Sequence, residues 1–173
     1  MIVVCPLHAV DAQIEHFGAN HVVSLLGPEH MIDTPAGIER DKHLQLTMHD
    51  IALPIDGYIT PGEAHVGRLI DFLGRWDRAA PMVIHCWAGI SRSTAAAFTA
   101  MCIYHPDAKE MELAQKLRSA SPIATPNPLI VAAADKLLGR DGRMSEAVDS
   151  IGRGASAWEG NVFTLDLPGS GKE

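Results

Sequence analysis

The chain has 173 residues, of which 47% are hydrophobic and 20% are charged, a balance typical of a folded globular domain rather than a disordered segment. Its formal net charge is −7 and it contains no basic run, which argues against nucleic acid and membrane surfaces as partners. The three cysteines do not make a disulfide framework, and neither a signal peptide nor a membrane-spanning run is recognisable. We therefore expect one domain over residues 1–173 in the cytoplasm, with residues 168–173 disordered.

The first third of the chain alternates short apolar strands with helical and irregular segments. Residues 9–17 have helical spacing, and Gly18 is expected to end that helix. Residues 27–41 and 49–59 are rich in proline, glycine and charge and therefore predict surface loops. Clustered or alternating aliphatic residues predict strands at 2–5, 21–26 and 43–48.

A capping-box pattern opens the next predicted helix. Thr60 and Glu63 supply the box, and Pro61 would occupy the first helical position. A buried strand is expected at 82–85, followed after a short loop by an apolar helix over 93–104.

Three more helices and a final strand complete the predicted elements. Asp107 is expected to cap the first of these helices, which would turn Met111, Ala114 and Leu117 inward. Asn127 is expected to cap the second, and Asp141 to start the third. Residues 162–167 predict an edge strand. Strands that alternate with helices predict an α/β fold with a mostly parallel central sheet of four to five strands flanked by helices.

The loop between the strand at 82–85 and its helix concentrates the residues of chemical interest. A glycine-bearing loop that leads into a helix directs backbone N–H groups and the positive helix end at an anion. That helix end and Arg92 both favour the thiolate form of Cys86, and the planar guanidinium matches two phosphate oxygens at once. The sequence therefore predicts a loop that holds phosphate against a nucleophilic sulfur. Its residues are His85, Cys86, Trp87, Ala88, Gly89, Ile90, Ser91, Arg92 and Ser93.

This motif resembles the signature of cysteine-dependent protein tyrosine and dual-specificity phosphatases. His85 and Cys86 stand five residues before Arg92 and Ser93, with Gly89 in between. The likeness is firm over residues 43–104, and the whole chain is similar to bacterial tyrosine phosphatase-like proteins. The resemblance implies the phosphatase fold and the hydrolysis of phosphotyrosine, other phosphoprotein or small phosphomonoester substrates, with no metal or organic cofactor.

The resemblance also implies a role for each residue of the motif. Cys86 would attack phosphorus and form a cysteinyl-phosphate, while Arg92 and the backbone N–H groups of residues 87–91 hold the phosphate oxygens. His85 would support the loop. Ser93 would donate a hydrogen bond to the sulfur and help it leave, although a serine at a helix start can also be a simple cap.

Two aspartates compete for the role of general acid, which the resemblance places in a loop upstream of the motif. Asp50 comes directly after the strand at 43–48, where such a loop begins in the family. Asp56 lies deeper in the same loop, among proline and glycine residues that shape turns. We favour Asp50 and keep Asp56 as the alternative.

Two other functions share this anion-binding loop. A catalytically weak phosphatase-like module would bind phosphate with neither aspartate productively placed. Another thiol enzyme, for sulfur transfer or arsenate reduction, would need persulfide chemistry at Cys86 or a second cysteine within its reach, whereas Cys5 and Cys102 are expected in the core.

Two further expectations concern individual side chains near the motif. Trp87 and Ile90 stand where phosphoinositide-directed relatives carry lysine, which disfavours an inositol lipid as substrate. The histidines show no metal-ligand spacing, and His43 and His49 are expected at the surface.

Overall fold

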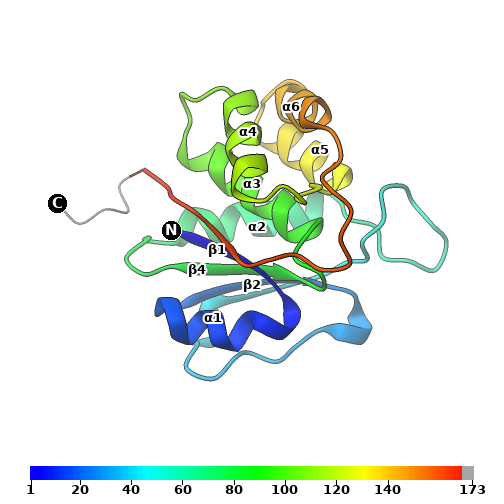
Figure 1. Cartoon of the computed structure of the whole chain (residues 1–173). Coiled ribbons are helices and arrows are strands. Elements are labelled where there is room, and N and C mark those ends of the chain that lie inside the picture. Colours follow the sequence, from blue (N-terminus) through cyan, green and yellow to red (C-terminus); the bar gives the residue numbers. More distant parts are fainter. Residues whose placement is uncertain (169–173) are drawn as a thin grey trace.

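The computed structural model describes residues 1–168 and shows a five-stranded sheet with helices on both of its faces (Figure 1). The strand order is β3-β2-β4-β1-β5, in which β5 runs antiparallel to β1 and every other pair is parallel. The expected α/β fold with a mostly parallel sheet and a C-terminal edge strand is thereby confirmed. The strands are β1 (Ile2–Pro6), β2 (His21–Leu26), β3 (His43–Thr47), β4 (Met82–Cys86) and β5 (Phe163–Leu165).

Five of the six helices cover one face of the sheet, and α1 (Val10–Phe17) covers the other (Figure 1). Gly18 ends α1 in the left-handed conformation, with φ of 62°, as expected. Short 3₁₀ turns occur at 7–9, 28–30 and 40–42. The remaining helices are α2 (Glu63–Arg75), α3 (Arg92–Tyr104), α4 (Glu110–Ala120), α5 (Pro128–Leu137) and α6 (Arg143–Ile151).

The central strands are buried on both faces, which explains their continuous apolar runs. All five residues of β1 and of β4 are buried, and the first cysteine, Cys5, lies in the smaller core under α1. The larger core lies between the sheet and α2–α6 and includes almost the whole of α3. The carboxyl ends of β2, β3 and β4 meet at one edge, where an α/β sheet offers its ligand site.

Three of the expected helix starts differ from those in the structure. The helix expected from Thr60 begins at Glu63 after an extended Gly62, and the Glu63 carboxylate pairs with Lys136 instead of closing a capping box. Neither Asp107 nor Asp141 caps its helix: Lys109 and Gly142 occupy those positions without a side-chain cap.

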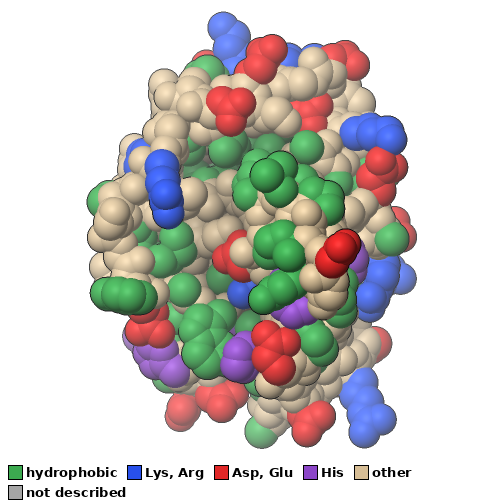
Figure 2. Space-filling view, turned by 90° about the vertical axis from the view of Figure 1, so that its right-hand side faces the viewer, with side chains coloured by type: hydrophobic (Ala, Val, Ile, Leu, Met, Phe, Trp, Pro, Cys, Tyr) green, Lys and Arg blue, Asp and Glu red, His purple; other side chains and the backbone are tan. Residues whose placement is uncertain are grey.

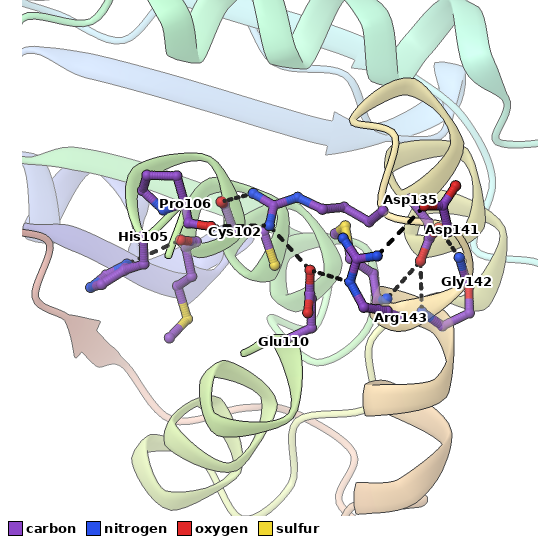
Figure 3. Close-up of polar contacts among 12 residues, drawn as sticks. Cys102, His105, Pro106, Glu110, Asp135, Asp141, Gly142 and Arg143 are labelled. Carbon is purple, nitrogen blue, oxygen red and sulfur yellow. Dashed lines mark hydrogen bonds and ion pairs between the residues drawn. The ribbon is translucent and has the colours of Figure 1, made fainter. Parts of the chain in front are cut away.

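The inward face of α4 agrees with the expectation for Ala114 and Leu117, which are buried, but not for Met111. Met111 is 38% exposed, whereas Leu113 and Glu110 are buried. Glu110 accepts hydrogen bonds from Arg140 and Arg143 at 3.1 and 3.2 Å, which satisfies a buried carboxylate that would otherwise be costly (Figure 3). These contacts turn the Glu110 face of α4 toward the segment between α5 and α6.

Asp135 on α5 supplies the cap that Asp141 does not. Its two carboxylate oxygens accept hydrogen bonds from the backbone N–H groups of Gly142 and Met144, both at 2.6 Å (Figure 3). Arg140 donates to the carbonyl oxygen of Cys102 at 2.7 Å, so this cluster also ties α3 to the α5–α6 connection.

Two expectations concern membranes and the chain end. Within residues 1–168, no helix combines the length and the apolar character needed to cross a bilayer. The disorder expected for residues 168–173 concerns, apart from Pro168, residues that lie outside the described part of the chain.

Candidate active site

The loop 87–91 connects β4 to α3 at the carboxyl edge of the sheet. Gly89 has φ of +72°, a conformation that favours glycine, and its backbone packs on the end of β1. Leu7 donates its backbone N–H to the carbonyl oxygen of Trp87 at 3.0 Å. The end of β1 therefore supports the loop from one side.

A segment near the end of the chain, residues 152–160, supports the loop from another side. Gly160 donates its backbone N–H to the carbonyl oxygen of Ala88 at 2.7 Å, and Ala155 donates to Pro122 at 3.0 Å. A Cβ on Gly160 would lie 2.9 Å from the carbonyl oxygen of Gly89, so the two backbones are in direct contact. Sequence patterns gave no signal for this contact.

Cys86 ends β4, is only 1% exposed, and faces the first turn of α3. Its sulfur lies 3.2 Å from the Ser93 hydroxyl oxygen, and either atom can donate the hydrogen. Since α3 begins at Arg92, Ser93 lies inside the helix rather than at its cap position. A hydroxyl so placed can donate to a thiolate and stabilise its charge.

Arg92 is buried at the start of α3, with 6% of its surface exposed. Its Nη1 donates to the carbonyl oxygen of Met48 at 2.9 Å, which fixes the guanidinium between α3 and the end of β3. Its Nε is buried and makes no hydrogen bond within the described residues. A buried guanidinium with an unused donor is suited to an anion in front of the loop.

The structure brings Asp50, and not Asp56, to the loop. One carboxylate oxygen of Asp50 accepts hydrogen bonds from Ser91 Oγ at 2.6 Å and from Asn127 Nδ2 at 3.0 Å. The other lies 3.7 Å from Arg92 Nε. Asp56 is exposed in the 49–59 loop and has no hydrogen bond or ion pair with any residue in the range 1–168.

His85 belongs to a buried chain of polar groups that sequence reasoning missed. Its Nε2 lies 2.6 Å from the Ser24 hydroxyl, which in turn lies 2.8 Å from His43 Nε2. His43 Nδ1 reaches Thr34 Oγ1 at 3.2 Å. The expectation of a surface His43 is wrong. Its ring packs against Ser24 of the neighbouring strand β2, and the residue is only 8% exposed.

Burial favours the neutral form of the imidazoles of both His85 and His43. It lowers the pKa of His85 to about 4, although the backbone of Cys86 acts in the opposite direction. Burial also lowers the pKa of His43. The Ser24 hydroxyl has one proton, so it donates to one ring and accepts from the other, which links the tautomers of the two histidines.

Beside the loop lies an open groove of about 720 Å³, bounded by Asp50, Ser91, Asn127, Arg153 and Trp158. The 49–59 loop projects from this edge of the sheet, and Figure 2 views the molecule from that side. Hydrophobic side chains gather across the middle of this face (Figure 2). We call five exposed side chains on this face the apolar rim. They come from the 49–59 loop, the 87–91 loop and the groove, and they are Leu53, Ile55, Tyr58, Trp87 and Trp158.

The other two cysteines lie apart from this chemistry. Cys5 and Cys102 are free and buried, and burial raises the pKa of each thiol to about 12. Within residues 1–168, no three His, Cys, Asp or Glu side chains are grouped so that they could hold a metal ion.

Comparison with known proteins rests on structure. No family model matches the chain, and no curated protein matches its sequence. The crystal structure of human DUSP28 has 20% identity and a TM-score of 0.58 and is matched over 86% of this chain and 94% of that one. The Yvh1 phosphatase domain from Chaetomium thermophilum has 19% identity and a TM-score of 0.59, over 83% and 93%. PTPMT1 in complex with PI(5)P has 14% identity and a TM-score of 0.55, over 87% and 92%.

These likenesses show that the chain has the fold of the cysteine-dependent tyrosine and dual-specificity phosphatases. The expected fold family is therefore confirmed.

Proposed function

We propose that this protein is a cysteine-dependent phosphatase that hydrolyses phosphomonoesters, with phosphoproteins as its substrates. The observation that carries the proposal is the meeting of three groups at one loop. The Cys86 sulfur lies beside the Ser93 hydroxyl, and the buried Arg92 guanidinium keeps an unused Nε. The fold shared with dual-specificity phosphatases supports the same function.

The reaction proceeds in two phosphoryl transfers. The Cys86 thiolate attacks phosphorus as the bond from phosphorus to the ester oxygen breaks, and Arg92 with the loop N–H groups stabilises the equatorial oxygens. Asp50 gives its proton to the leaving oxygen. Water then attacks the cysteinyl-phosphate, Asp50 takes a proton from it, and the sulfur leaves as a thiolate that accepts a hydrogen bond from Ser93.

Other residues of the loop bind or support rather than react. The backbone N–H groups of residues 87–91 surround the phosphate position, and His85 holds the end of β4 through Ser24. The chemistry of the proposal needs neither a metal nor an organic cofactor.

The apolar rim favours a protein substrate. Trp158 is fully exposed and Leu53 is 72% exposed, and such side chains usually mark an interaction surface when they gather in one region. A phosphorylated segment with apolar neighbours fits this surface best. We place the protein, as one domain, in the reducing cytoplasm, where the Cys86 thiol stays free.

The test is hydrolysis of p-nitrophenyl phosphate by the wild type, Cys86→Ser and Cys102→Ser. We expect turnover in the wild type and in Cys102→Ser, and none above background in Cys86→Ser. If the wild type has no turnover but binds vanadate in a manner that needs Arg92, the protein is a phosphate-binding module. If Cys102→Ser also loses turnover while it remains folded, a two-cysteine thiol reaction is favoured instead.

A further inference from the structure

A second groove, of about 570 Å³, lies between α1 and the segment 32–36. It is separate from the groove beside Asp50, because α1 covers the face of the sheet opposite the other helices (Figure 1). Its wall includes three half-buried aliphatic side chains, those of Leu7, Ile14 and Ile32. Its lining also includes three exposed carboxylates, those of Asp11, Glu15 and Asp33. We call this feature the α1 groove.

The three carboxylates of the α1 groove have no counter-charge. Within residues 1–168 none of them forms an ion pair or a side-chain hydrogen bond, and no lysine or arginine lines the groove. The nearby His8 ring is directed to Glu159, at 2.9 Å. Arg40 shares a neighbouring polar pocket with Asp33, but the two side chains form no ion pair in the described range. The α1 groove therefore combines an aliphatic wall with unpaired negative charge.

The charge of Glu15 does not stabilise the helix that carries it. Asp11 lies in the first turn of α1, where the positive end of the helix favours an acidic side chain. Glu15 lies in the last turn, where the same dipole disfavours it. The two residues are four positions apart, so their like charges face the same side of the helix and repel each other. A cation bound in the groove would relieve this repulsion.

Leu7 connects the α1 groove to the phosphate loop. It lines the groove, and its backbone N–H donates to the carbonyl oxygen of Trp87 at 3.0 Å. One polypeptide can therefore contact the groove and place another of its residues at the loop. A second copy of this chain does not suit the groove, because its sequence contains no basic run. A phosphoprotein that comes to the loop as substrate is the better occupant.

We propose that the α1 groove binds a segment of the phosphoprotein substrate in which aliphatic residues are interspersed with lysine or arginine. The inference rests on the proposed phosphatase function. The aliphatic side chains of the segment pack on Leu7, Ile14 and Ile32. Its cations reach the three carboxylates and lay their methylene stems along the wall. The bound segment tethers the substrate and raises the local concentration of its phosphorylated residue at Cys86.

The first experiment measures binding without any phosphate group. The probe is a fluorescein-labelled peptide of alternating arginine and leucine, and its fluorescence anisotropy gives the Kd. Neutralisation of the groove should raise the Kd of this peptide by about 10-fold, because three charge pairs are lost. The groove variant combines Asp11→Asn, Glu15→Gln and Asp33→Asn.

A matched control variant makes the same change in net charge away from the α1 groove. It neutralises three exposed carboxylates on the face of the sheet opposite α1, by Asp71→Asn, Asp107→Asn and Glu146→Gln. At about 0.15 M salt, charges farther away than about 8 Å are largely screened, so the control should change the Kd by less than about 2-fold. Equal losses in the two variants would reduce the effect to net charge and overturn the site.

The aliphatic wall is tested with a second peptide, in which serine replaces every leucine. Its Kd should be about 10-fold higher than that of the first peptide, because it buries less apolar surface. Equal Kd values for the two peptides would overturn the role of the wall.

The second experiment tests the tether. A phosphotyrosine peptide is joined to the arginine–leucine segment by a flexible glycine–serine linker, in both orders. In the wild type its KM should be about 10-fold lower than that of the phosphotyrosine peptide alone. The groove variant should lose this advantage, while its kcat and KM for p-nitrophenyl phosphate stay unchanged.

The two experiments separate failure of the tether from failure of the phosphatase function. Equal KM values for the joined and the free phosphopeptide would overturn the tethering of substrate while the phosphatase function stands. A wild type without turnover that depends on Cys86 would overturn the phosphatase function. The Kd values of the first experiment would still decide whether the α1 groove binds a basic aliphatic segment.

Discussion

Gly89 lies so close to Pro6 that a methyl group on Gly89 would be 2.8 Å from the Pro6 backbone nitrogen. The phosphate loop and the end of β1 therefore meet backbone against backbone, with no side chain between them. Gly89 also has φ of +72°, so its conformation and its packing both call for glycine. The curvature of the loop around the phosphate position depends on this contact.

Replacement of Gly89 by alanine should damage both stability and activity. A matched control is Gly37→Ala, since Gly37 has a similar φ of +82° but open space around its Cβ position. The control should lower the free energy of unfolding by about 1 kcal/mol, because alanine is strained in the left-handed conformation. Gly89→Ala should lower it by about 2–4 kcal/mol, because overpacking adds to that strain. Urea unfolding and p-nitrophenyl phosphate turnover measure the two effects. Equal losses in the free energy of unfolding for the two variants would contradict a close contact between Gly89 and Pro6.

The two aspartates of the 49–59 loop should behave differently when neutralised. Asp50→Asn should lower kcat/KM for phenyl phosphate by about 10² to 10⁴-fold, because the leaving oxygen loses its proton donor. Asp56→Asn should change it by less than about 2-fold, since Asp56 is exposed and has no partner in the described range. The measurement is the pH profile of kcat/KM, in which Asp50→Asn should lose the limb at high pH. The reverse pattern would make Asp56 the acid.

Arg92→Lys should keep the positive charge but lose the planar set of donors. Vanadate mimics the transferred phosphoryl group, and its inhibition constant should rise by about 10-fold or more, since one ammonium cannot both reach Met48 and bind two oxygens. Arg75→Lys, at the exposed end of α2, is the control and should leave the constant unchanged. Unaltered inhibition of Arg92→Lys would show that backbone N–H groups alone hold the anion.

The stability of the protein should fall on acidification, partly because of His85. Burial lowers the pKa of His85 to about 4 in the folded protein, so the unfolded chain binds a proton first as the pH falls. The contribution of this ring to the free energy of unfolding is complete above about pH 6.5, and it decreases by about 2 kcal/mol between pH 7 and pH 5. Urea unfolding at several pH values should show a smaller decrease for His85→Gln than for the wild type. Parallel pH curves would contradict a neutral His85.

Trp158→Ala should separate large from small substrates. A phosphotyrosine peptide with apolar flanking residues should lose about 3 to 10-fold in kcat/KM, because one buried aromatic contact is removed. The value for p-nitrophenyl phosphate should be unchanged, since this ester does not reach the groove edge. Leu137→Ala, which removes an exposed apolar side chain at the end of α5, serves as control. Identical losses for peptide and small ester would argue against a substrate role of the apolar rim.

Local patterns predicted the elements well where tertiary contacts agree with them. The apolar runs of β1, β2 and β4, the end of α1 at Gly18 and the Asn127 cap all depend on neighbours in sequence. The Thr60 capping box failed although its residue types were right: Gly62, in an extended conformation, is the N-cap residue, and Glu63 is the first residue of α2. On α4, Ala114 and Leu117 are buried as predicted, whereas Met111 is exposed and the neighbouring Glu110 is buried against Arg140 and Arg143.

The candidate site also combines features that the local sequence predicts with features that depend on distant contacts. Cys86 and Arg92 lie in one loop, so their proximity follows from the motif and the strand–loop–helix pattern. Asp50 receives its hydrogen bonds from Ser91, 41 positions away, and from Asn127, 77 positions away, which no spacing rule could predict. The link between His85 and His43 through Ser24 likewise requires the order of strands in the sheet.

The contact between Gly160 and Ala88 has a consequence for the folding of the protein during its synthesis on the ribosome. Cys86 and Arg92 emerge long before residues 152–160, so the hydrogen bond from Gly160 to the carbonyl oxygen of Ala88 can form only after this late segment has been made. Contacts between distant parts of a chain form late, because the ends must first be brought together. The nascent chain therefore carries the complete motif but lacks this one support of the loop until residue 160 has left the ribosome.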